Sequence, residues 1–209
     1  LDRYRLKPRD EKLPALVLES ETYSKEKNKQ STNKKFRKDF FPKGLYVQVS
    51  SFNNINVLIS GNLRPVKLIV NLNEETKKTI ENYEMQKGIS PFSKKDTIIS
   101  LDPFLREESL KETEDTLIFL VESGYFSFVL NNLAHVKILK EIAEKLKNIY
   151  LNLIAGPYLY TFNRYAIKYL EEIGITKIIS PIENSYSNVE ECYKNNGTRH
   201  NVLLTVFAY

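Results

Sequence analysis

The feature that most constrains the fold of this 209-residue chain is an alternation of strand-like and helix-like segments. Short runs rich in Val, Ile, Leu and aromatic residues recur roughly every 25 residues from residue 44 onward, each followed by a helical pattern. Nearly continuous apolar strands joined by amphipathic helices are typical of a parallel sheet with helical crossovers. The predicted strands are 44–51, 66–73, 96–103, 125–132, 149–156, 176–181 and 201–209.

Helices are predicted in every interval between these strands. The second one begins with acidic residues and ends at a glycine, as helices often do. The third one places Leu110, Leu117, Leu120 and Val121 on one apolar face. The predicted helices are 51–62, 73–88, 106–124, 133–148, 163–174 and 187–197.

The strand count favours one type of α/β fold over another. Seven strands without a GxGxxG turn favour a (β/α) barrel over a doubly wound nucleotide-binding sheet. A complete barrel of this kind has eight strands and about 250 residues. We therefore predict an incomplete, TIM-barrel-like α/β fold with about seven strands.

Composition limits the class of protein further. With 42% hydrophobic and 27% charged residues, the chain is of the globular type and long enough for one domain. No apolar run approaches the ~20 residues that a membrane helix needs. The chain begins without a methionine and without a secretion signal. We therefore expect a cytoplasmic piece of a longer protein.

The positive charge is concentrated at the start of the chain. The net charge of +5 divides into +6 over residues 1–44 and −1 over residues 45–209. Residues 20–39 are Lys-rich and almost without aliphatic side chains, which predicts a flexible linker. The alternative is a basic arm that contacts phosphates. Residues 1–44 are therefore predicted as a basic N-terminal segment and linker, and residues 45–209 as a partial barrel domain.

The small number of cysteines and histidines disfavours metal centres and the familiar catalytic triads. Cys192 is the single cysteine, and the two histidines are His135 and His200. We predict that His135 lies inside a helix. We predict that His200 precedes the last strand and so lies at the end of the barrel opposite the carboxyl ends of the strands. That placement disfavours a Ser-His-Asp triad. We predict no metal site and no cofactor within this chain.

The carboxyl ends of the predicted strands carry the candidate functional residues, because barrels of this class place their chemistry there. Asp102 and Glu183 are the rim carboxylates available for acid–base catalysis, and each has a helix-capping or loop role as its alternative. The amides also suit turns, so recognition and turn chemistry both remain open for them. The predicted substrate-binding residues are Asn131, Asn132, Tyr158, Tyr160, Asn163, Arg164 and Asn184.

The stretch 156–174, GPYLYTFNRYAIKYLEEIG, is unusually rich in aromatic rings. We predict that Tyr165 and Tyr169 pack where the helix meets the sheet. Tyr158, Tyr160 and Phe162 alternate by two on a predicted extended segment, so they should point the same way. A pocket lining and a core position remain equally open for these three rings.

Three stretches in the same order resemble the collagenase-like peptidases, peptidase family U-32. The first is LYVQVSSFNNINVLISGN at 45–62, and the second runs from SLDPFLREES to HVKILKE at 100–141. The third, at 158–191, has an aromatic-Asn helix start, a Leu-Glu-Glu-Ile-Gly helix end and a Ser-Pro turn. The turn departs from the family pattern, because the acid at Glu183 is displaced by one position.

The resemblance implies a truncated C-terminal barrel domain of a longer bacterial protein, with the Lys-rich leader as an interdomain linker. It implies a peptidase domain. The alternatives are an iron–sulfur-dependent protein that hydroxylates RNA bases or a quinone precursor, or a non-catalytic module that binds RNA or a partner. Any four-iron four-sulfur cluster would be held by cysteines of the parent protein outside this chain. The implied partners are the preceding domain and an RNA or peptide substrate, and no membrane.

Overall fold

A computed structural model describes residues 41–55, 65–85, 93–147, 149–194 and 201–206 of the chain. All of these residues belong to one compact unit that comprises residues 37–209. The predictions for residues 1–40, for His200 and for the end of the last strand at 207–209 lie outside the described residues. The same holds for the part of the first predicted helix beyond residue 55.

Seven parallel strands form a single sheet whose spatial order equals the order along the chain. Each strand pairs in parallel with its neighbours along the chain, for example Tyr46 with Lys67 and Leu68 with Thr97, and the first and last strands form the two edges. The strands are β1 (Tyr46–Val49), β2 (Lys67–Asn71), β3 (Thr97–Ser100), β4 (Ser127–Leu130), β5 (Asn152–Ala155), β6 (Lys177–Ile179) and β7 (Asn201–Leu203).

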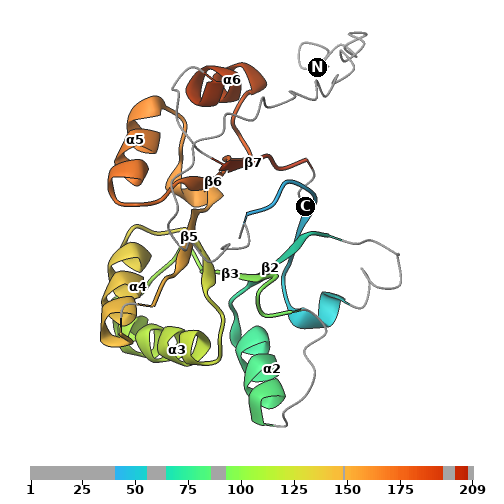
Figure 1. Cartoon of the computed structure of the whole chain (residues 1–209), viewed down its shortest axis with the longest axis vertical. Coiled ribbons are helices and arrows are strands. Elements are labelled where there is room, and N and C mark those ends of the chain that lie inside the picture. The colour runs from blue at the N-terminus through green and yellow to red at the C-terminus, as the bar shows by residue number, and fades with distance from the viewer. Residues whose placement is uncertain (1–40, 56–64, 86–92, 148, 195–200, 207–209) are drawn as a thin grey trace, which may run out of the picture. The chain divides into compact units, whose positions relative to one another are not determined.

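The helices lie on the outer side of the curled sheet (Figure 1). This arrangement is a half-barrel, and it confirms the predicted incomplete, TIM-barrel-like α/β fold. The α-helices are α2 (Glu74–Met85), α3 (Leu110–Glu122), α4 (Ala134–Lys145), α5 (Arg164–Glu172) and α6 (Tyr186–Lys194). Short 3-10 helices are η2 (Phe52–Asn54), η3 (Glu107–Ser109) and η4 (Pro157–Leu159).

Side-chain alternation along the strands divides the core into two layers. On the helix-facing side, strand residues such as Leu68, Ile99 and Phe128 pack with buried residues of the helices, including Leu120 and Leu139. On the inner side, each of β2 to β6 contributes one residue to a second cluster. Its strand members are Ile69, Ile98, Val129, Ile154 and Ile179. Burial on both faces explains why the strands read as continuous apolar runs.

The two ends of α5 follow from its sequence. Asn163 accepts hydrogen bonds at its Oδ1 from the backbone N–H groups of Tyr165 and Ala166, at 3.0 and 2.9 Å, and so caps α5. Gly174 follows the same helix with a φ of +90°, a left-handed conformation that favours glycine. None of the helices within the described ranges has the length and apolar character needed to cross a membrane.

Candidate functional site

The carboxyl ends of β4 and β5 border an open pocket of about 580 Å³. Its walls come from the loop after β3, the loop after β4, the turn after β5, and α5. We call it the aromatic rim pocket. It is lined by Pro103, Phe104, Asn131, Asn132, Leu133, Tyr158, Leu159, Tyr160, Ala166, Tyr169 and Leu170. The structure thus brings together four of the predicted substrate-binding residues, Asn131, Asn132, Tyr158 and Tyr160.

The turn after β5 aims two of the tyrosines at this pocket. The prediction of an extended segment there was wrong, because Pro157–Leu159 forms a 3-10 turn. Tyr160 follows in the left-handed conformation, with φ 49° and ψ 55°, which a residue other than glycine adopts only when its surroundings hold it. Its ring stacks on Phe162 with centroids 5.9 Å apart. The tyrosines are half exposed and line the pocket, whereas Phe162 does not.

Asn131 lies at the buried base of the pocket, with 7% of its surface exposed. Its Nδ2 donates to the carbonyl oxygen of Leu101 at 2.7 Å and to Oγ of Ser100 at 3.3 Å, which ties β4 to β3. Its Oδ1 is enclosed without a hydrogen-bond partner. It lies against Gly156, where an added Cβ would come within 1.9 Å of it. Residue 156 is therefore a glycine because the Asn131 amide occupies the space of a side chain.

Asn132 combines a turn role with a pocket position. Its Oδ1 accepts from the backbone N–H of Ala134 at 3.0 Å, and its Nδ2 donates to the carbonyl oxygen of Pro103 at 3.2 Å. The side chain thus starts α4 and fixes the loop after β3 at once. Because Asn132 also lines the pocket, both predicted roles, substrate recognition and turn formation, stay open for it.

The prediction that Tyr165 and Tyr169 pack where the helix meets the sheet was wrong. Tyr165 is 70% exposed and Tyr169 is 51% exposed. The apolar face of α5 is formed by Ile167 and Leu170 instead. Tyr169 lines the aromatic rim pocket, and Tyr165 does not. The two tyrosines therefore form a natural pair of pocket and non-pocket residues on one helix.

Three other predicted binding residues lie outside this pocket. The Oδ1 of Asn163 is occupied by the cap of α5. The Arg164 guanidinium lies over the Tyr165 ring, with its Cζ 5.1 Å from the ring centroid. Asn184 accepts at Oδ1 from Nδ2 of Asn188 at 2.6 Å, which joins the turn after β6 to α6. These contacts give each of the three residues a structural role that does not involve a ligand.

The two predicted rim carboxylates lie in different loops. Glu183 is in the turn after β6 and does not line the aromatic rim pocket. Asp102 follows β3, and its Oδ1 accepts from the backbone N–H of Phe104 at 2.7 Å, an Asx turn. Asp102 also lines a smaller cavity of about 220 Å³ at the carboxyl ends of β2 and β3. We call this the charged rim cavity.

A histidine that sequence reasoning set aside lines the same cavity. His135 is indeed in a helix, but it is the second residue of α4, so it lies at the rim beside the carboxyl ends of the strands. The ring is 2% exposed. Burial lowers the pKa of His135 to about 4, and the nearby Asp102 carboxylate partly opposes this shift. The short interval between the predicted strand at 125–132 and His135 was the signal that could have found it.

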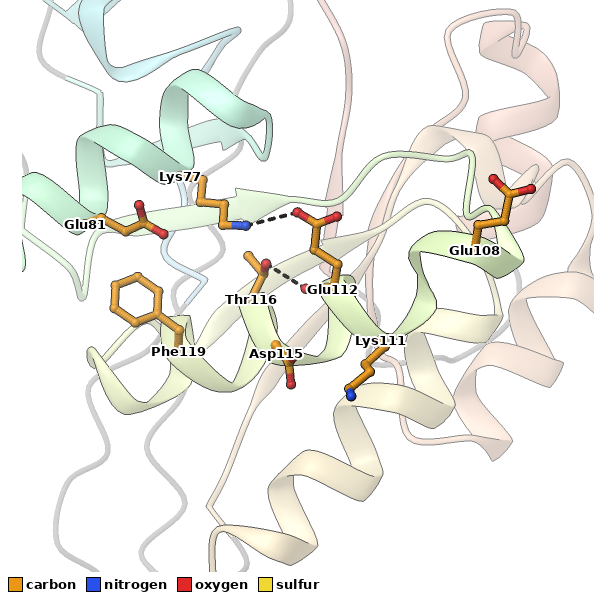
Figure 2. A pocket seen from close by; sticks show the side chains of 8 residues that line it. All are labelled: Lys77, Glu81, Glu108, Lys111, Glu112, Asp115, Thr116 and Phe119. Carbon is orange, nitrogen blue, oxygen red and sulfur yellow. Dashed lines mark hydrogen bonds and ion pairs between the residues drawn. The ribbon is translucent and has the colours of Figure 1, made fainter.

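A third hollow, of about 620 Å³, lies on the outer surface between α2 and α3 (Figure 2). Lys77 and Glu81 of α2 face Glu112 and other residues of α3 across it, and Lys77 Nζ lies 3.3 Å from Glu112 Oε1. It mixes four carboxylates with two lysines, the composition of solvated helix faces. We assign no function to this outer groove, although its Lys77–Glu112 pair also borders the charged rim cavity.

The described residues do not contain a group of three or more His, Cys, Asp or Glu side chains that could hold a metal ion. The single cysteine, Cys192 of α6, is buried, and its Sγ lies 3.5 Å from the carbonyl oxygen of Phe162. Burial raises the pKa of its thiol, which disfavours the thiolate that metals bind. One cysteine in this setting does not fit an iron–sulfur cluster, so this chain's residues would not hold one.

The fold and the rim residues define a class: a half-barrel of parallel β/α units with its aromatic and titratable groups at the carboxyl ends of the strands. No family model matches the chain, and no curated protein matches it. Among solved structures, the chain is similar to MenC from Desulfotalea psychrophila LSv54, at 11% sequence identity and a TM-score of 0.44. The similarity covers 83% of this chain and 51% of that one, so this chain spans about half the length of MenC.

Proposed function

We propose that the chain is the substrate-binding barrel of a collagenase-like protein of the U-32 type, and that the aromatic rim pocket takes a ring-bearing segment of a peptide substrate. The observation that carries this proposal is the convergence of Asn131, Asn132, Tyr158 and Tyr160 in one pocket. These residues come from two loops, and they meet where barrels of this class bind their ligands.

The pocket suits a planar, largely apolar group that is anchored by a few polar contacts. Phe104 and the three tyrosines supply ring faces and edges, for which an aromatic guest has favourable packing geometries. The pocket volume of about 580 Å³ exceeds the size of one side chain, so neighbouring backbone of the same peptide can enter with it. The tyrosine hydroxyls can bond the peptide groups, and the Asn132 amide retains one N–H and one lone pair beyond its bonds to Pro103 and Ala134.

The pocket lining itself contains neither a hydroxyl nucleophile of Ser or Thr nor a Cys, His or carboxylate. Cleavage within this chain would therefore depend on the adjacent loop, where Asp102 directly precedes the pocket residue Pro103. In that role, Asp102 would take a proton from the attacking water and return it to the leaving amine. Glu183 lies in the turn after β6 and would contact only a substrate that extends across the rim.

Binding can be measured directly because the chain contains no tryptophan. The fluorescence of an unstructured peptide with one Trp then reports only the peptide when it is excited selectively. We expect saturable binding that Tyr169→Ala weakens by about tenfold, as loss of one aromatic contact of ~1.4 kcal/mol would do. The matched control is Tyr165→Ala on the same helix, which should bind as the unmodified chain does. Equal affinities of the two variants, or no saturable binding, would overturn the proposal.

Recognition of an RNA base is the second candidate, because exposed rings with nearby amides also suit an unstacked base. A single-stranded RNA that displaces the Trp peptide, and whose own binding is weakened by Tyr169→Ala, would favour it. Iron and acid-labile sulfide, measured in the longer parent protein kept free of oxygen, would then test the hydroxylation reading. About four of each per chain are expected for one four-iron cluster.

A further inference from the structure

The charged rim cavity carries a second inference, which goes beyond the proposed function. At its buried end lies the His135 ring, 2% exposed. Of the two ring nitrogens, Nδ1 is fully enclosed and has no hydrogen-bond partner. This leaves Nε2 as the nitrogen that can face the cavity. Among the described residues Nε2 has no hydrogen-bond partner either, so a ligand in the cavity can supply one to Nε2, whereas Nδ1 stays enclosed.

The open end of the cavity is acidic. Glu74, Asp102 and Glu112 line it together with a single lysine, Lys77. Lys77 is paired with Glu112, at 3.3 Å between Nζ and Oε1. Among the described residues, neither Glu74 nor Asp102 has a cationic partner within ion-pair distance. The mouth therefore has two carboxylates whose charge is not balanced by Lys77, the lysine of the cavity lining.

We propose that the charged rim cavity binds a small amino alcohol, with its hydroxyl group at His135 and its primary ammonium group between Asp102 and Glu74. A volume of about 220 Å³ accommodates a molecule of a few heavy atoms between these two ends.

The chemistry of each end selects the ligand group. Because the imidazole is neutral near pH 7, one of its nitrogens donates and the other accepts. A hydroxyl both donates and accepts, so it satisfies Nε2 in either tautomer. A cation held against the imidazole would lose its hydration beside Leu101 and would have only the Asp102 carboxylate near it, which is costly. At the mouth, the same cation keeps water on one side and gains attraction from two carboxylates.

Three probes of matched size separate these contributions. 3-Amino-1-propanol has both groups, n-butylamine replaces the hydroxyl by a methyl group, and 1,3-propanediol replaces the ammonium by a hydroxyl. The chain has only two histidines, so the imidazole NMR signals of His135 can be assigned with a single His200→Gln variant. We expect 3-amino-1-propanol to shift the His135 signals saturably, with each of the other probes binding about tenfold more weakly or less.

Two carboxylate variants complete the test. Asp102→Asn keeps the oxygen that accepts from Phe104 N–H but removes the charge, and it should weaken 3-amino-1-propanol by about tenfold. Glu183→Gln removes a rim charge outside the cavity, and it should leave the affinity unchanged. An affinity for 1,3-propanediol equal to that for 3-amino-1-propanol would overturn the proposal, as would shifts without saturation at tens of millimolar. Equal effects of the two variants would also overturn it.

Discussion

The aromatic rim pocket and the charged rim cavity are neighbours that share Phe104, yet they offer opposite chemistry. The pocket is open, uncharged and lined by tyrosines, and its buried amide is used to hold two strands together. The cavity is small, acidic at its mouth, and has a neutral imidazole at its buried end. The comparison teaches that one half-barrel rim can carry two kinds of site, because each strand end contributes its own loop residues.

The largest expected effect concerns the cavity. The pKa of His135 is about 4 in the folded chain and about 6.5 when exposed, so the unfolded state binds the proton more tightly. Stability is therefore complete above pH 6.5 and falls as the pH drops toward 4, by about 3 kcal/mol. Urea unfolding at pH 7 and pH 4.5 should show this loss, and His135→Leu should show a smaller one. A comparable loss in the variant, or in His135→Gln, would contradict the assignment.

The next effect concerns the pocket. Gly156→Ala places a Cβ against Oδ1 of Asn131 and within 2.8 Å of Val129 Cγ1, so the strand end must move. We expect a loss of about 2 kcal/mol in the free energy of unfolding, with weaker Trp-peptide binding and unchanged His135 signals. Gly174→Ala is the control, because it meets no atom within 4 Å and is strained only by its φ of +90°. A loss no larger than that of Gly174→Ala would show that the Asn131–Gly156 contact is not tight.

A smaller effect on stability is expected at Asn163, and it tests whether this residue belongs to the aromatic rim pocket. Asn163→Ala removes the N-cap of α5 and should cost about 1 kcal/mol of stability. Asn163→Asp retains the capping oxygen and should be nearly neutral. If Asn163 only caps the helix, both variants bind the Trp peptide normally in conditions where they are folded. Weaker binding by the stable Asn163→Asp variant would instead place Asn163 among the substrate-binding residues.

The smallest effect concerns the ion pair that borders the cavity. Lys77→Gln breaks a partly exposed pair with Glu112, and such pairs contribute about 0–1 kcal/mol. Its effect on stability should be within that range. The affinity for 3-amino-1-propanol should increase, because the cavity mouth loses its competing ammonium group. A decrease in affinity, measured by the same His135 signals, would show that Lys77 helps to hold the ligand.

Much of the fold followed from periodicity, because strands buried on both faces and helices with one apolar stripe leave clear patterns. The strand ends also predicted Asn131, Asn132, Tyr158 and Tyr160 as rim residues, and these four share one pocket. Whether they bind a substrate remains a prediction.

Two features could not be read from these patterns. Tyr169 was misplaced because a tyrosine suits both a core and a half-exposed surface, so its ring does not reveal which it occupies. His135 was set aside because helix membership says nothing about which end of the helix a residue occupies, and the first turn of α4 lies at the rim.

The sequential order of the strands has a consequence for how the chain assembles. Paired residues such as Tyr46 and Lys67, or Ile99 and Phe128, are 21 to 29 positions apart, and this range holds for all six pairs of neighbouring strands. Each new strand on a growing polypeptide can therefore dock on the strand made just before it, because its pairing partner has already been synthesised. Pairing with the preceding strand alone favours stepwise growth of the sheet, unit by unit, as in repeat proteins.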